Sequence, residues 1–156
     1  MAALSNFIEN HLIDFLLRAQ SLGITGATAA AGTGPATTYI ALFTAAPTAA
    51  GGGTEVVSTG TNYSRVPITS ALTAWAGTQG AGTTVASSGT SGQTSNNAVV
   101  TFANPSASWG TITSVGIFDA ATGGDLLMFG NLTSPQAVSP TNPAIFPAGS
   151  LVLSLS

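Results

Sequence analysis

The stretch from residue 106 to 135 constrains the fold most, because it holds two strand-like runs joined by a short polar turn. Aliphatic and small residues alternate along 111–118, and an apolar run follows at 126–129. The sequence between them, DAATGGD, is polar and contains two glycines. Such a pattern predicts an antiparallel β-hairpin. Since both sides of the first run carry apolar residues, we expect its strand to lie inside a sheet and not at an edge.

Further strand-like segments lie on both sides of this hairpin. They cover residues 38–47, 56–69, 70–76, 97–102 and 150–155. Pro67 favours an edge or a bulge for the second of these, and Trp75 is the expected anchor of the third. About seven short strands, separated by turn signals, and one helix at the start predict a mainly β chain. The expected fold is an antiparallel β-sandwich or barrel with one N-terminal amphipathic α-helix.

Residues 5–22 form the one convincing helical pattern. Ser5 or Asn6 can cap it, Asn6 and Glu9 have the spacing of a capping box, and Gly23 is placed to end it. The apolar stripe predicted to face the core consists of Leu4, Ile8, Leu12, Phe15, Leu16, Ala19 and Leu22. The opposite face, predicted to be solvated, carries Asn6, Glu9, Asn10, Asp14, Gln20 and Ser21.

Ile13 and Leu17 interrupt this pattern, because they lie four residues apart within the polar face. Contact with a neighbouring subunit would explain them, and two ordinary exposed aliphatic residues are the alternative. Phe7, His11 and Arg18 border the two faces. The residues predicted to contribute to an assembly interface are Phe7, Ile13, Leu17, Arg18, Arg65 and Trp75.

Composition along the chain divides it into three parts. Residues 1–24 contain the helix, 25–38 form a flexible arm rich in Ala, Gly and Thr, and 39–156 form the β domain. Within the last part, residues 77–95 hold almost no apolar side chains. A loop of that length in a compact domain indicates contact with a partner or disorder.

Charged side chains are scarce. Arg18 and Arg65 are the only cations apart from one histidine, and charged residues make up 4% of the chain, against about 25% in an average domain. Such a surface does little to keep copies apart. We interpret the chain as one that works packed against copies or partners, the alternative being a monomer simply rich in small residues.

The scarcity of charged residues also limits the classes of partner that the chain can bind. Two isolated arginines do not supply the clustered cations that phosphate recognition uses, so no nucleic-acid partner is expected. The apolar segment 4–22 contains Glu9, Asp14 and Arg18, so it is too charged and too short to span a membrane, and it lacks the pattern of a signal peptide. There is no cysteine for a disulfide. These features favour a cytosolic product that assembles locally.

The sequence gives little indication of a catalytic or metal-binding site. His11 is the only histidine, and no nucleophile elbow accompanies it. Asp119 and Asp125 flank the hairpin turn and could offer oxygens to Ca²⁺, although polar residues at a solvated turn explain them as well. Glu55 is expected to pair with Arg65. The sequence therefore predicts no enzyme, no cofactor and no metal site.

Three segments together resemble a group of small virion proteins of tailed bacteriophages, described as tail fibre or as capsid decoration (cement) proteins. They are ATTYIALFTAAPTAAGGGTEV with NYSRVPIT, then ASWGTITSVGIFDAATGGDLLMFGNLTSP, then IFPAGSLVLSLS. The stretches 27–36 and 77–95 depart from the pattern as insertions. The resemblance implies a non-enzymatic structural protein, present in many copies, that binds across major capsid protein subunits.

The first hypothesis is accordingly a cement protein on the capsid surface of the virion, with the major capsid protein and itself, as a homodimer or homotrimer, for partners. The alternative is a tail or fibre component, either an adaptor or a host-binding tip. A further alternative is a small carbohydrate-binding module with Trp75 and Trp109 as stacking platforms.

Overall fold

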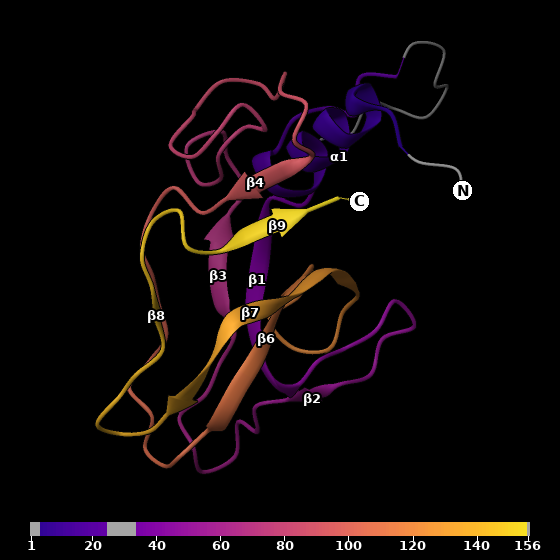
Figure 1. The fold of residues 1–156 in the computed structure, drawn as a ribbon. Helices are drawn as coiled ribbons and strands as arrows, with labels where there is room; N and C mark the ends of the chain where they lie inside the picture. The colour runs from indigo at the N-terminus through magenta and orange to yellow at the C-terminus, as the bar shows by residue number, and fades with distance from the viewer. Residues whose placement is uncertain (1–3, 25–33, 156) are drawn as a thin grey trace. The chain divides into compact units, whose positions relative to one another are not determined.

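The computed structural model describes residues 4–24 and 34–155 and contains, within them, one α-helix and nine short strands (Figure 1). The elements are α1 (Asn6–Arg18), β1 (Thr37–Ala45), β2 (Thr54–Glu55), β3 (Val66–Thr69), β4 (Gln93–Ser95), β5 (Val100–Thr101), β6 (Gly110–Phe118), β7 (Leu126–Val138), β8 (Ile145–Phe146) and β9 (Val152–Ser154). All recorded strand pairings are antiparallel. The prediction of a mainly β, antiparallel chain with one N-terminal helix is confirmed, although about seven strands were expected.

The chain forms two compact units, each assembled from separate segments. The first unit contains the described residues of Met1–Thr37 together with Thr69–Val99 and Pro147–Ser156. The second contains Thr38–Ile68 and Val100–Phe146. Most of the predicted arm, residues 25–33, lies outside the described residues, so the division into helix, arm and β domain stays a prediction.

The first unit pairs β4 with β9, so that Thr94 lies opposite Leu153. Leu151 and Leu153 are buried and Val152 is exposed, which confirms the alternation predicted for the last strand. The segment 70–76 forms turns and an isolated bridge from Trp75 instead of the expected strand. The core of this unit consists of Ile13, Leu17, Trp75, Ala76, Leu151 and Leu153.

The second unit is built on a five-stranded sheet in the order β2-β1-β6-β7, with β3 also paired to β1. The predicted hairpin is present as β6 and β7, and β6 lies between β1 and β7 as expected. A cluster of aromatic rings fills part of the core, with centroid separations of 5.2 to 6.2 Å. Its members are Tyr63, Phe102, Trp109 and Phe146.

The ends of α1 differ from the prediction in two respects. Ser5 is the N-cap, and its hydroxyl accepts a hydrogen bond from the Ile8 N–H. Asn6 is therefore not the N-cap and does not form a capping box with Glu9. The helix ends at Arg18 because Ala19 adopts a left-handed conformation with φ 56°, four residues before Gly23. The Gln20 N–H then bonds to the Asp14 carbonyl and closes the last turn.

Glycine at the centre of β6 lies in a tightly packed site. A Cβ atom built on Gly116 would lie 2.9 Å from both Leu126 Cδ1 and Phe43 Cε2. The neighbouring strand offers a matched comparison, since a Cβ atom on Gly130 meets nothing within 4 Å.

We expect Gly116→Ala to lower the free energy of unfolding by about 1 to 3 kcal/mol, because the added methyl group overpacks the sheet. Gly130→Ala is the control and is expected to be neutral or slightly stabilising, because alanine restricts the unfolded chain. Urea unfolding followed by circular dichroism measures both. Equal stability of the two variants would contradict the packing described for Gly116.

Candidate functional site

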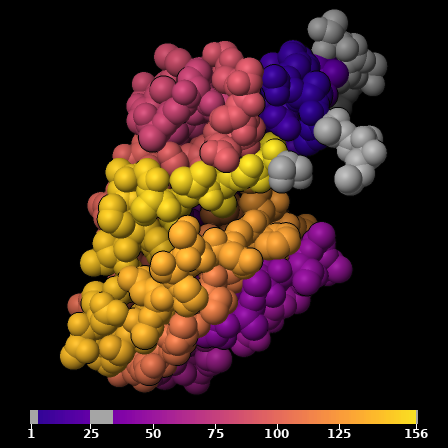
Figure 2. Space-filling model, viewed as in Figure 1, coloured from indigo at the N-terminus to yellow at the C-terminus, as the bar shows by residue number. Residues whose placement is uncertain are grey.

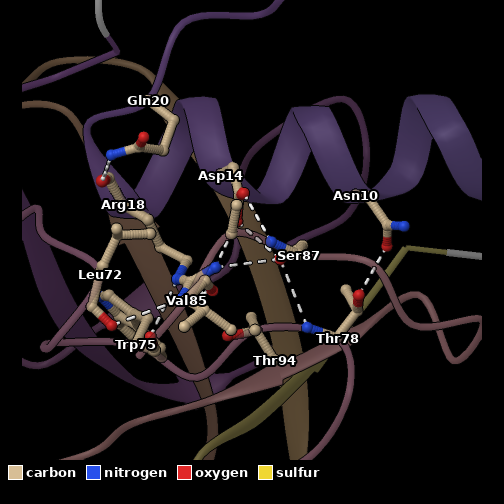
Figure 3. A network of polar contacts seen from close by, with 12 residues as sticks. Asn10, Asp14, Arg18, Gln20, Leu72, Trp75, Thr78, Val85, Ser87 and Thr94 are labelled. Carbon is tan, nitrogen blue, oxygen red and sulfur yellow. Dashed lines mark hydrogen bonds and ion pairs between the residues drawn. The ribbon is translucent and has the colours of Figure 1, made fainter. Parts of the chain in front are cut away.

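The most elaborate polar site in the first unit surrounds Arg18, on the last turn of α1 (Figure 3). The guanidinium is completely buried, and its Nη1 atom lies 2.5 Å from Asp14 Oδ1, one helical turn earlier. The same nitrogen donates to the Ser87 hydroxyl at 3.1 Å. A buried charge is tolerated only when it is paired and hydrogen-bonded, and this pair meets both conditions.

The remaining donors of Arg18 hold the loop that follows β3. Nε donates to the Trp75 carbonyl at 3.0 Å, and Nη2 donates to the carbonyls of Leu72 at 3.3 Å and Val85 at 2.7 Å. These acceptors lie 54 to 67 residues along the chain from the arginine. One side chain therefore fixes the path of a loop that has little apolar content of its own.

Asp14 and Asn10 extend the same contact toward the start of the helix. Asp14 accepts hydrogen bonds from the backbone N–H and the hydroxyl of Ser87, at 2.8 and 2.6 Å. Asn10 accepts from the Thr78 hydroxyl at 2.6 Å and donates to the Gly89 carbonyl at 3.0 Å. Figure 2 shows the helix, in indigo, directly against this segment, in pink. The stretch 77–95, expected to be a partner-binding or disordered loop, is thus docked on α1.

The helix presents the opposite face to the one predicted. Its buried residues are Asn10, Ile13, Asp14, Leu17 and Arg18. Of the apolar stripe, Leu4 is 51% exposed, and Ile8, Leu12, Phe15 and Leu16 are only partly covered. The prediction was wrong because it assigned Asn10 and Asp14 to solvent and placed Arg18 only at the border of the two faces. Here the three polar side chains are buried with partners supplied by the loop, and Ile13 and Leu17 fill the space beside them.

In the second unit, Arg65 has a similar role at the rim of the sheet. Its Nε and Nη2 atoms donate to the two oxygens of Glu55 at 2.9 and 2.8 Å, which confirms the predicted pair. Nη1 donates to the carbonyls of Ala120 and Gly123 in the β6–β7 turn. The guanidinium also lies 3.5 Å from the centre of the Phe118 ring. The turn is thereby tied to the sheet.

Tyr63 links this ion pair to the core. Its hydroxyl accepts a hydrogen bond from the buried Leu42 N–H and donates one to Glu55 Oε1, both at 2.9 Å. Burial raises the pKa of the Tyr63 phenol well above its usual range, and the carboxylate of Glu55 raises it further. The phenol therefore stays protonated and acts as a structural donor.

The two tryptophans are core residues. Trp75 is fully buried and Trp109 is 4% exposed, with its indole N–H donating to the Thr61 carbonyl at 2.8 Å. Neither ring offers the exposed face that stacking on a sugar needs. The carbohydrate-binding hypothesis loses its two platforms for this reason.

The remaining polar candidates have local structural partners. His11 Nδ1 lies 2.8 Å from the Phe7 carbonyl oxygen, and its ring packs on the Phe7 ring. Asp119 Oδ1 accepts the Asp125 N–H at 2.7 Å and so closes the hairpin turn. Among the described residues, no three potential metal-ligating side chains cluster together. No described helix is long and apolar enough to cross a membrane.

The structure thus distributes the six predicted interface residues between interior and surface. Ile13, Leu17, Arg18 and Trp75 are completely buried within the chain, the Arg65 side chain is 8% exposed, and Phe7 is 51% exposed. Arg18 and Trp75 are brought together by a hydrogen bond. The role of these residues in assembly stays a prediction, and Phe7 is the member of the set with the largest free surface.

Sequence reasoning missed the residues that cooperate with the arginines. Ser87, Thr78 and Tyr63 complete the two polar sites, yet nothing in their local sequence distinguishes them from other serines, threonines and tyrosines. The i, i+4 spacing of Asp14 and Arg18 was a usable signal, because such pairs are neighbours on a helix.

The family of the chain is shown by a match that covers almost all of it. Residues 3–154 match the model of the family described as Podophage GP4 fiber I protein gp80. The chain belongs to this family. No curated protein matches it. Membership in the gp80 family makes the chain a phage structural protein, in agreement with the resemblance stated above.

We expect Asp14→Asn to destabilise the protein by about 3 to 5 kcal/mol, because it leaves the buried Arg18 guanidinium without a counter-charge. Glu9→Gln makes the same change in charge on the first turn of the same helix and should cost less than about 1 kcal/mol. Chemical denaturation of both variants provides the comparison. Similar decreases in the free energy of unfolding of the two variants would contradict a stabilising role for the Asp14–Arg18 pair.

Tyr63→Phe is expected to cost about 1 to 3 kcal/mol at neutral pH, since it leaves the buried Leu42 N–H unpaired. The raised pKa of Tyr63 also predicts that the wild type loses stability as pH rises above 10.0, the ordinary pKa, because the unfolded chain then releases a proton that the folded protein retains. The Tyr63→Phe variant should not show this decrease in stability at alkaline pH, because it has no phenol to ionise. Unfolding curves between pH 8 and 11 for the two proteins test the prediction, and parallel curves would refute it.

Proposed function

We propose that the chain is a non-enzymatic structural component of a phage tail or fibre. The observation that carries the proposal is the match of residues 3–154 to a family named for a fibre protein. That name favours the tail or fibre alternative over the capsid cement hypothesis with its major capsid protein partner.

The chemistry of the described residues supports a structural role. Both arginines are engaged in ion pairs and backbone contacts inside their own units, and the chain has no lysine. Of the acidic residues, Asp14 and Glu55 are held by these arginines. The surface is therefore composed largely of uncharged polar and small apolar groups, which lose little hydration when another protein covers them.

Two grooves of the described part are lined by neither histidine nor cysteine. One of about 260 Å³ is lined by the loop around Thr78 and by Thr94 and Val152, and another of about 370 Å³ lies beside Tyr63 and Arg65. The first is lined by uncharged residues, and in the second the Tyr63 and Arg65 side chains are already bonded to Glu55. Both grooves are therefore compatible with a structural role.

Counting and locating the protein in purified virions tests the proposal. A tail or fibre component is expected in tens of copies or fewer per particle, with antibody label at the tail. Quantitative mass spectrometry against the major capsid protein gives the number, and immunogold microscopy gives the place. Hundreds of copies distributed over the head would overturn the fibre assignment and favour the cement hypothesis.

A further inference from the structure

Strand β7 leaves one edge of the large sheet open. Its recorded pairing is with β6, and within the described residues no other backbone or side-chain hydrogen bond involves the backbone of residues 126–136. An antiparallel strand directs part of its N–H and C=O groups away from its partner. Those groups form a row that matches another extended chain.

The part of this edge suited to pairing is Leu126–Asn131. Here β7 follows β6 in regular register from Met128, opposite Ile117, to Asn131, opposite Ser114, and the register shifts on both sides of this stretch, at Leu127 and beyond Asn131. The segment reads LLMFGN and has neither charge nor proline. Proteins usually protect open edges with lysine, proline or a bulge, and here bulges at Leu127 and beyond Asn131 leave a regular stretch from Met128 to Asn131.

The side chains around this edge are apolar and accessible. Phe129 is 41% exposed, and Leu126 and Leu127 are partly exposed. Together with Thr48–Gly51 they line a shallow groove of about 600 Å³. The face of the sheet at Gly130 is also open, because a Cβ atom built there meets nothing within 4 Å. An uncharged apolar edge of this kind is an association site.

The distribution of charge indicates which partner fits. Asp125, at the beginning of the segment, is the one charge in the groove lining. If two copies pair antiparallel over Leu126–Asn131, the two Asp125 residues lie at opposite ends, roughly 23 Å apart at 3.3 Å per residue. No like charges then face each other. Antiparallel pairing is also the geometry of the β1–β2, β1–β6 and β6–β7 pairs of the same sheet, and a two-fold axis closes the contact on itself.

We propose that the outer edge of β7, residues Leu126–Asn131, pairs antiparallel with the same edge of a second copy of this chain. The contact joins two sheets through backbone hydrogen bonds and covers Phe129 and its groove. It concerns contact between copies and does not depend on where in the virion the protein is located.

The first test compares self-association of purified full-length variants. Phe129→Lys is expected to weaken the dimer at least about tenfold, because each copy brings a charge to the paired edge. Val99→Lys is the control, since Val99 is 58% exposed and lies outside β7. It should leave the dissociation constant within about twofold of the wild type. Sedimentation velocity gives these constants, and circular dichroism verifies that each variant is folded.

A wild type that stays monomeric, or one whose association is unaffected by Phe129→Lys, would overturn the proposal. If Phe129→Lys fails to fold, Leu127→Lys at the same edge replaces it under the same criteria.

The second test measures the geometry of the pair. Because the chain has no cysteine, Asp125→Cys and Asn131→Cys each supply one site for a spin label. Antiparallel pairing centred on the segment predicts distances between equivalent Cα atoms of roughly 23 Å and roughly 17 Å. Parallel pairing in register would bring both to roughly 5 Å, and absence of dipolar coupling would exclude pairing. Either of the last two results contradicts the proposal.

The two proposals fail separately. Virions that carry the protein on the head would overturn the fibre assignment while the edge contact stands. A protein located at the tail that shows no dipolar coupling at residues 125 and 131 would overturn the edge contact while the fibre assignment stands.

Discussion

The first unit depends on the buried ion pair between Arg18 and Asp14. Burying two charges is unfavourable unless every donor and acceptor is engaged. Here the guanidinium is bonded to the Asp14 carboxylate, the Ser87 hydroxyl and three backbone carbonyls, and the carboxylate also takes the Ser87 N–H. The requirement for these partners organises the loop, because a stretch poor in apolar residues has little hydrophobic driving force to fix its path.

The second unit applies the same physical solution at the β6–β7 turn. Arg65 engages Glu55 with two nitrogens and holds two carbonyls of the turn with the third. Tyr63 completes the arrangement by connecting Glu55 to the backbone of β1. Each of the two arginines of the chain thus stabilises a loop, and the surface is left poor in charge.

Much of the β structure was predictable from local patterns. The β6–β7 hairpin, the interior position of β6 and the alternation of Leu151, Val152 and Leu153 all follow from residues close together in sequence. The N-cap at Ser5 was also among the predicted alternatives. Segment 70–76 was mispredicted as a strand because its apolar residues pack into the core through turns. Trp75 is anchored there by its carbonyl, which accepts from Arg18.

By itself, the sequence determined that the chain is mainly β with one N-terminal helix and that it has only two arginines and no lysine. It also predicted the pairing of Glu55 with Arg65. Only the tertiary structure decided which face of α1 is buried. Hydropathy assigns Asn10 and Asp14 to solvent and Arg18 to the border of the apolar face, because each side chain is judged without partners. Apart from the contact between Asp14 and Arg18 themselves, the partners lie 54 to 79 residues away along the chain, and a polar group can be buried once folding supplies them. No local pattern contains that information.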